Sequence, residues 1–399
     1  MYNKIMNKLI DLILNSINET GEKEKIDEST YSIFKFHSLS HLLYNVKSNE
    51  TDKDVSAKIN ESYFKAINRD TIQLKEYEKI EKLFEENGID AIFLKGCVMK
   101  YIYKETFYRS MTDIDCLVRK EHFRKAKKLI KNMGYTVDSN SEHHIEFQKK
   151  PIMVFELHRM LIPKVEYGKN IFDGLFERSK LKNGMKHIYQ MSDEDFYLFM
   201  MCHLLKHYYI AGTGIRSFLD VYVYLKNKPN LDFEYINNKL KTLEYYSEFE
   251  FLKNFSLDVF DGNELNEKEK EVLKYIIESG TYGLHSNVIK KDLEESKGSV
   301  FRVVFRKLFP KYSTLIHIYP SLKKVPFLLP LYYIRRHIYF IMHLKRSIGR
   351  RNDYKEYKEE HRIWNIVDTA EMKLMTMQIF VHTVVQDLII MKIHMKLTY

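Results

Sequence analysis

Asp113 and Asp115 stand two residues apart in a stretch, 113–119, that predicts a β-strand. Because side chains alternate along a strand, both carboxylates lie on one face of it. Neighbouring carboxylates repel each other, so the pair is costly unless a cation lies between them. Glu156 is a third acid, in the later predicted strand 152–158. Carboxylate oxygens are the ligands that Mg²⁺ prefers, and bound Mg²⁺ keeps positions open for phosphate oxygens.

A tight turn precedes the two aspartates. The apolar run 91–94 predicts a buried strand, Lys95 and Gly96 follow it, and a helix is expected to begin at Cys97. The first N–H groups of a helix bind anions, and Lys95 and Arg109 add positive charge nearby. A phosphate-binding turn, three carboxylates and flanking cations are the parts that metal-assisted phosphoryl or nucleotidyl transfer needs.

Several stretches carry a resemblance to a known family. The most specific are Phe93-Leu94-Lys95-Gly96, the run from Arg109 to Val118, Gly134-Tyr135, and Phe155-Glu156-Leu157-His158. They resemble the uncharacterised bacterial nucleotidyltransferase family of the DNA polymerase β-like superfamily. Further similar positions are His203, Lys206, His207, Gly212, Gly214, Arg216, Asp220 and the proline-containing stretch 320–335. The resemblance spans roughly residues 30–350.

The resemblance implies transfer of a nucleoside monophosphate from a nucleoside triphosphate, ATP foremost, to a hydroxyl of an acceptor. It implies two Mg²⁺ (or Mn²⁺) ions held by Asp113, Asp115 and Glu156, which would be the catalytic residues, with Glu156 also a possible base. Residues implied to bind the nucleotide are Lys95, Gly96, Arg109, His158, Lys206 and Arg216. Many superfamily members have Gly-Gly or Gly-Ser at the turn, where this chain has Lys95-Gly96-Cys97. A serine hydroxyl for a phosphate is therefore missing, and the charge of Lys95 would replace it.

Other readings of these residues stay open. The same metal site could transfer a sugar from a nucleotide-sugar or a phosphoryl group, or the site could be degenerate in a nucleotide-binding or membrane-surface module. Arg109 could equally pair with Asp113 or Asp115 as a buried ion pair. Lys206, Arg216 and Asp220 fit either a helical wall over the nucleotide or ion pairs between helices.

The histidines do not form a known zinc motif. His203 and His207 are four apart and share a helix face, but the glutamate of a His-Glu-x-x-His motif is absent because Leu204 follows His203. A structural or substrate-facing role is expected for them. The three cysteines, Cys97, Cys116 and Cys202, are too few and too apolar in their surroundings for a disulfide framework. They are typical of a reduced, cytoplasmic protein.

Charge is distributed unevenly along the 399 residues. The chain has 64 basic and 54 acidic residues, and 13 of the basic ones lie between 296 and 352, where there is no acidic residue. That leaves 51 basic against 54 acidic residues elsewhere, so the chain as a whole does not have the character of a nucleic-acid binder. The basic segment suits peripheral contact with an anionic acceptor or membrane surface, or a helical scaffold with cations at its rim. Its longest uncharged apolar run, 325–334, is half of what a transmembrane segment needs.

Only 14 glycines and 7 prolines interrupt the chain, which favours long helices. The expected fold class is α+β, with a polymerase β-like nucleotidyltransferase core of small mixed sheet and flanking helices, embedded in a mostly helical protein. The expected regions are a helical N-terminal part (1–87), the α/β core (88–162), a helical domain over the nucleotide site (163–295), and the basic segment with a C-terminal helix (296–399). Helices are expected at 121–133, 193–208, 214–227, 232–261, 266–280, 285–308 and 368–397.

Overall fold

The computed structural model describes residues 2–141, 143–162, 171–210, 212–243, 245–281 and most of 302–338. The chain divides into two compact units, Met1–Leu284 and His285–Tyr399. The first unit contains a mixed sheet and a helical part, and it has two apolar cores. One core lies mainly among the helices, and the other lies against the sheet. This arrangement confirms the α+β prediction, whereas the finer division into four regions stays a prediction.

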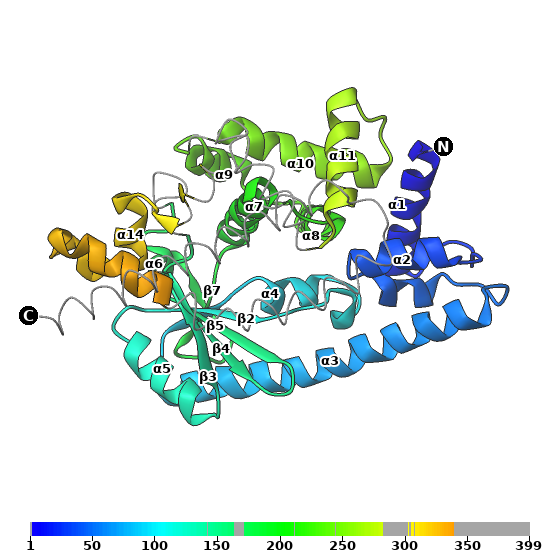
Figure 1. Ribbon diagram of the computed structural model, residues 1–399. Coiled ribbons are helices and arrows are strands. Elements are labelled where there is room, and N and C mark those ends of the chain that lie inside the picture. The colour runs from blue at the N-terminus through cyan, green and yellow to red at the C-terminus, as the bar shows by residue number, and fades with distance from the viewer. Residues whose placement is uncertain are drawn as a thin grey trace, which may run out of the picture. The chain divides into compact units, whose positions relative to one another are not determined.

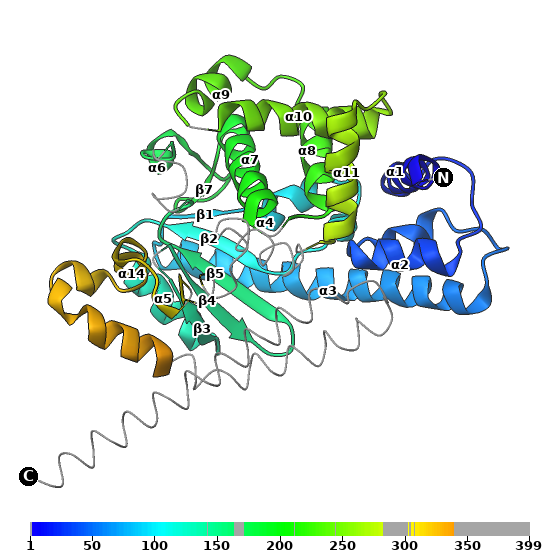
Figure 2. The same ribbon diagram turned by 45° about the horizontal axis from the view of Figure 1, so that its top comes forward.

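A seven-stranded mixed sheet lies at the centre of the first unit, with the order β3-β4-β5-β2-β1-β7-β6 (Figure 2). Its strands are β1 (Ala91–Phe93), β2 (Ile114–Val118), β3 (Thr136–Asn140), β4 (His144–Lys149), β5 (Met153–His158), β6 (Lys180–Leu181) and β7 (Ile188–Gln190). β2 runs antiparallel to β1 and parallel to β5. β4 and β5 pair antiparallel and are joined by a turn at residues 150–152. The sheet therefore brings the two acid-bearing strands side by side.

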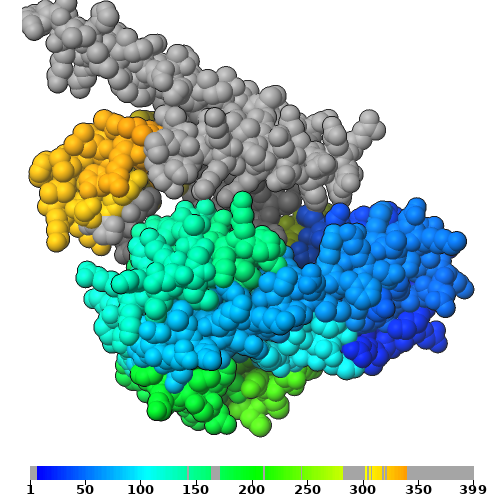
Figure 3. Space-filling model, turned by 90° about the horizontal axis from the view of Figure 1, so that it is seen from below, coloured from blue at the N-terminus to red at the C-terminus, as the bar shows by residue number. Residues whose placement is uncertain are grey.

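One face of the sheet is covered by the long helix α3 (Lys53–Glu86) and by α5 (Phe123–Asn132), as Figure 1 shows. Asp52 begins α3 by accepting hydrogen bonds from the backbone N–H groups of Asp54 and Val55. Tyr77, Ile80 and Phe84 of α3 pack against the strands. The opposite side of α3 forms a long strip of the surface in Figure 3. The covered face is the apolar one, so Asp115 of β2 must face the other way.

Helices cover the other side of the sheet in Figure 1. They are α7 (Asp193–Ile210), α8 (Ile215–Asn227), α9 (Phe233–Leu240), α10 (Tyr246–Asp261) and α11 (Glu267–Ser279). The single helix expected over 232–261 is wrong, because the chain turns between α9 and α10. There the Thr242 hydroxyl donates to the Lys239 carbonyl at 2.7 Å, an alternative to the helical backbone pattern. The turn lets Leu240 and Leu243 reach the same core as α10.

The N-terminal part of the first unit is helical, as expected. It comprises α1 (Tyr2–Asn18), α2 (Glu28–Phe36) and the 3₁₀ helix η1 (Ser40–Asn45). Short elements follow β1 and the sheet: α4 (Gly96–Met99), η2 (Lys100–Ile102), η3 (Thr106–Tyr108) and α6 (Leu175–Arg178). The helix expected to start at Cys97 is thus a single turn that continues as a 3₁₀ turn. The segment from α4 to η3 carries the chain from Lys95 to the aspartates.

In the second unit, the described residues form α14 (Tyr312–Ile318), η4 (Pro320–Lys323) and η5 (Pro326–Leu328). Leu315 and Leu322 are buried within it. The helix expected at 368–397, and most of that at 285–308, lies outside the described residues. Within the part of the chain that is described, no helix has the length and apolarity to cross a membrane.

Candidate active site

Neighbouring strands bring the three predicted acids together. β2 and β5 pair in parallel with Asp115 opposite Glu156, so the two side chains project from the same face. Asp113 precedes β2 and points to that face as well. One carboxylate oxygen from each of the three lies within 4.8 Å of the others. The period-two argument from the sequence therefore describes the arrangement seen here.

Asp115 lies at the bottom of this group and is fully buried, with 0% of its side chain exposed. Its Oδ1 accepts hydrogen bonds from Lys95 Nζ at 2.7 Å and from His158 Nε2 at 3.0 Å. The same His158 nitrogen donates to Glu156 Oε2 at 3.1 Å. Asp115 Oδ2 is buried and has no hydrogen-bond partner among the described residues. A buried anionic oxygen without a partner is costly, and a metal ion would satisfy it.

The charges of the group are strongly coupled. Burial disfavours the charged form of Glu156, yet the hydrogen bond from His158 and the charge of Lys95 lower its pKa to about 2. Burial also disfavours the Lys95 ammonium, but attraction to Asp115, Asp113 and Glu156 raises its pKa. Burial and repulsion from Asp115 raise the pKa of Asp113. Carboxylate, ammonium and imidazole thus stabilise one another in a largely buried site.

The turn before the acids holds Lys95 in an unusual conformation. Its φ of +43° is rare for a residue with a side chain, and such strained residues are concentrated at functional sites. Gly96 follows it and is buried. A Cβ on Gly96 would lie 2.6 Å from Met111 Cγ, so the glycine is required by the packing of Met111. The structure therefore gives Gly96 a role in placing the loop that carries Asp113.

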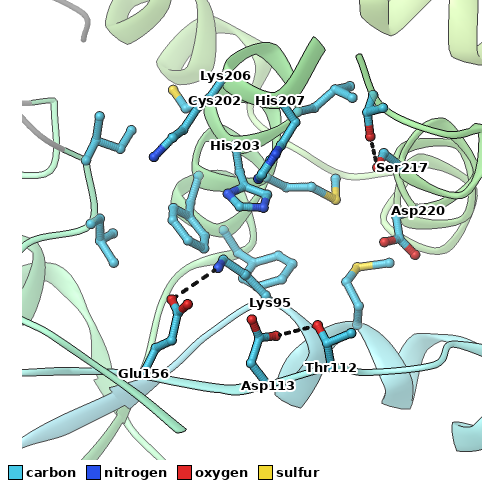
Figure 4. Close-up of a pocket in the computed structure, with 18 of the residues that line it drawn as sticks. Lys95, Thr112, Asp113, Glu156, Cys202, His203, Lys206, His207, Ser217 and Asp220 are labelled. Atoms are coloured by element: carbon cyan, nitrogen blue, oxygen red, sulfur yellow. Dashed lines mark hydrogen bonds and ion pairs between the residues drawn. The ribbon is translucent and has the colours of Figure 1, made fainter. Parts of the chain in front are cut away.

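A cavity of about 380 Å³ opens above the carboxylates. Lys95, Asp113 and Glu156 line it from the sheet side, and α7 and α8 supply the opposite wall (Figure 4). The positively charged or imidazole-bearing residues along the cavity, besides Lys95 and His158, are Arg109, His143, His144, His203, Lys206, His207 and Arg216. Lys206 and Arg216, singled out in the sequence, therefore reach the same cavity as the acids.

Arg109 pairs with Asp220 of α8 rather than with Asp113 or Asp115. Its Nη2 and Nε donate to Asp220 Oδ2 at 3.0 Å and 3.2 Å, and the Tyr103 hydroxyl donates to Asp220 Oδ1 at 2.8 Å. A second link runs beside it, from Arg216 Nη1 to Ser110 Oγ at 2.8 Å. Both sides of the cavity are thus joined through the loop that precedes Asp113.

A hydrogen bond joins the loop before Asp113 to α3, and the sequence did not predict it. Gln73 donates from Nε2 to the Met111 carbonyl at 2.9 Å, and both groups are buried. The Thr112 hydroxyl donates to Asp113 Oδ1 at 3.0 Å. No pattern in the sequence marks Gln73, because its position depends on how α3 crosses the sheet.

His144 is a further residue that sequence reasoning did not assign to the site. It lies opposite His158 in the β4–β5 ladder, and with Glu156 the two histidines form a second group whose ligand atoms lie within 4.8 Å. The signal was available, because a hairpin centred on Pro151 places residues seven before and seven after it in register.

Burial lowers the pKa of His143 to about 3 and that of His207 to about 4. These imidazoles are neutral at physiological pH.

The donor set fits a hard divalent cation. Three carboxylates lie close together, and one of them, Asp115, has a buried oxygen that lacks a partner among the described residues. The other two, Asp113 and Glu156, line a cavity with room for phosphate oxygens. The His144–Glu156–His158 group would suit a softer ion, but the Nδ1 atoms of both histidines lack an acceptor among the described residues. Histidines that bind a metal usually donate their second N–H to such an acceptor. The cluster of Asp113, Asp115 and Glu156 is therefore the stronger candidate for a metal site.

Comparison with known proteins places the chain in a family. No curated protein and no solved structure matches it. A family model described as uncharacterised nucleotidyltransferase matches residues 25–251, more than half of the chain. The match covers the three acids and the residues of α7 and α8 that line the cavity. It confirms the resemblance to this family over residues 25–251, while the part of the resemblance beyond residue 251 stays a prediction. The chain therefore belongs to the uncharacterised nucleotidyltransferase family.

Proposed function

We propose that the protein is a Mg²⁺-dependent nucleotidyltransferase. It moves a nucleoside monophosphate from a nucleoside triphosphate, ATP foremost, to a hydroxyl of an acceptor such as a small molecule, a glycan or a peptide. The observation that carries the proposal is the cluster of Asp113, Asp115 and Glu156, in a chain of a nucleotidyltransferase family. Asp113 and Glu156 line a cavity that Lys95, Lys206 and Arg216 also line. Mn²⁺ is an alternative ion for the same oxygens.

Each acid has a distinct part in this proposal. Asp113 and Asp115 would hold the divalent cation, which when bound neutralises phosphate charge and lowers the pKa of the acceptor hydroxyl. Glu156, with a pKa of about 2, stays ionised and is a poor proton acceptor at neutral pH. Its part is therefore that of a ligand rather than a general base.

The opposite wall would receive the nucleotide. Lys206 and Arg216 line the cavity from α7 and α8, where their charges suit the triphosphate. In the reaction, the acceptor oxygen forms a bond to the α-phosphorus, the bond from that phosphorus to the bridging oxygen breaks, and pyrophosphate leaves with the bonding electrons. The acceptor proton passes to solvent or to a neutral imidazole of the cavity.

Mass spectrometry tests the proposal. Purified protein is incubated with all four nucleoside triphosphates, Mg²⁺ and cell extract, and small molecules and peptides are examined for added mass. We expect the mass of one nucleoside monophosphate on an acceptor, absent with a chelator and absent with Asp113→Asn. A hexose or a single phosphate as the added mass would replace this function with transfer of a different group. No added mass under any condition would contradict an active transferase.

A further inference from the structure

Lys95 lies among the carboxylates where a metal ion is expected. Its Nζ is 2.7 Å from Asp115 Oδ1 and 4.0 Å from Glu156 Oε2. The side chain is 19% exposed, so the ammonium lies in the site rather than in solvent. A lysine ammonium is protonated at neutral pH in water. The group thus contains a cation of its own.

The backbone fixes this position. Lys95 directly follows the Leu94 that continues β1, and its backbone has φ +43° and ψ −113°. The Leu94 N–H donates to the Asp115 carbonyl at 3.0 Å, which ties the turn to β2 beside the acid that Lys95 contacts. A strained conformation persists only when its surroundings hold it. The turn therefore holds Lys95 among the three carboxylates.

Hydrogen bonds within the protein already occupy one carboxylate oxygen of Asp115 and one of Glu156. Asp115 Oδ1 accepts from both Lys95 and His158, and Glu156 Oε2 accepts from His158. The buried Asp115 Oδ2 has no partner among the described residues, and Glu156 Oε1 has only the distant His144 Nε2, at 3.9 Å. These two oxygens and the Asp113 carboxylate are the ones left for a metal ion. The remaining oxygens suffice for one ion.

The charges of the site also indicate one divalent ion. With the His158 imidazole neutral, three carboxylates and the Lys95 ammonium sum to two negative charges, which one divalent ion neutralises. Two divalent ions in a shared site lie about 3.5–4 Å apart. A second ion bound to Asp115 Oδ1 would need the position that the ammonium holds, and the two cations would repel each other.

We propose that Lys95 is the resident second cation of this site, so that the protein binds one divalent ion where the wider superfamily is expected to bind two. The inference rests on the proposed nucleotidyl transfer and specifies how its charge is balanced. The ammonium would face the triphosphate beside the single ion. It would take over the charge that a second ion otherwise supplies.

Electron paramagnetic resonance of the wild-type protein with Mn²⁺ tests the number of ions directly. The full-length protein is titrated with Mn²⁺, with and without a non-hydrolysable ATP analogue. We expect one bound Mn²⁺ and the six-line spectrum of an isolated ion in both cases. Two bound ions with an exchange-coupled spectrum would overturn the inference.

Substitutions at Lys95 show whether the ammonium sets this number. Lys95→Met removes the charge, and we expect it to bind Mn²⁺ about tenfold more tightly or to take up a second ion, because three carboxylates then lack a cation. Lys95→Arg keeps the charge and should bind one ion. Lys206→Met removes another lysine of the cavity and should also bind one ion. If Lys95→Met behaves as the wild type does, Lys95 is not the second cation.

Transfer activity in the same preparations separates this inference from the proposed function. Activity with two coupled ions in the wild type would overturn the single-ion site and leave nucleotidyl transfer standing. One bound ion without transfer of any nucleotide would overturn the proposed function and leave the site as inferred. Failure of the wild type to bind Mn²⁺ at all would overturn both.

Discussion

The two aspartates of the site should respond differently to the same substitution. Asp113→Asn removes a proposed metal ligand that lines the cavity, so we expect transfer to fall by about 10²–10³-fold or more with little change in melting temperature. Asp115→Asn should abolish transfer as well. It also leaves the largely buried Lys95 ammonium without its closest counter-charge, at a cost of about 3 kcal/mol in the free energy of unfolding. Urea unfolding and the mass assay measure the two effects.

Two results would contradict this assignment. Wild-type turnover by Asp113→Asn with every nucleotide would exclude Asp113 as a metal ligand. Equal stability of the Asp113 and Asp115 variants would mean that the pair of Asp115 with Lys95 contributes nothing to folding.

The sequence predicted the acids better than their partners. Asp113, Asp115 and Glu156 follow from local rules, because the alternation along two strands decides their direction. Arg109 does not, since its choice of Asp220 over Asp113 depends on the packing of α8 more than a hundred residues later. Gly96 is another example: the family pattern suggested close approach of phosphate, whereas here a Cβ would meet Met111.

At the scale of elements, the Arg109–Asp220 pair joins the loop before β2 to α8. The Arg109 and Asp220 side chains are 15% and 8% exposed, so each is a buried charge that needs the other. Asp220→Asn should cost about 3 kcal/mol in the free energy of unfolding. A double-mutant cycle with Arg109→Met should give a coupling energy of about 1–3 kcal/mol. Because the loop carries Asp113, transfer should fall along with stability.

An exposed ion pair provides the matched control. Lys270 and Glu267 lie 2.7 Å apart on the surface of α11, and Glu267→Gln should leave the free energy of unfolding nearly unchanged, because exposed ion pairs contribute little. A coupling energy near zero for Arg109 and Asp220 would mean that α8 is not held to the loop by this pair.

The elements themselves were predictable to different degrees. The main strands and α5, α8 and α11 follow the period of their apolar residues. α7 is apolar on all sides, and the acids of its first turn mark its start instead. The short strands β6 and β7 were both missed, because two or three residues are too few to show a pattern and each strand depends on pairing with its neighbours. The break between α9 and α10 was missed for a related reason, since no glycine or proline marks it and tertiary packing decides it.

At the scale of the whole molecule, the basic residues of 296–352 and the buried histidines of the first unit have to be considered separately. The 13 basic residues of 296–352 lie far along the chain from the carboxylates, and their contact with an anionic partner stays a prediction. The first unit instead buries histidines in neutral form. Burial lowers the pKa of His37 to about 4, and it lowers that of His41 to about 4 although the Tyr108 carbonyl accepts a hydrogen bond from its ring.

These neutral histidines make the stability of the fold depend on pH. In the unfolded chain a histidine has a pKa near 6.5, so below that pH the unfolded state binds protons that the folded state refuses. Stability is therefore complete above about pH 6.5 and falls as the pH decreases toward the folded pKa of about 4. His37 and His41 should each contribute up to about 3 kcal/mol of this loss. His203 and His207, whose pKa values are also lowered, act in the same direction.

Urea unfolding between pH 7 and pH 5 measures the effect in a range where most carboxylates stay ionised. The free energy of unfolding should decrease steadily across it, and His37→Gln with His41→Gln should make the decrease shallower, because two of the groups that refuse protons are gone. His158 has the opposite sign: its pKa is raised by Asp115 and Glu156 against the effect of burial, so its contribution is lost only as the pH rises through the folded value. An unchanged slope in the double variant would mean that these two histidines are accessible to protons in the folded protein.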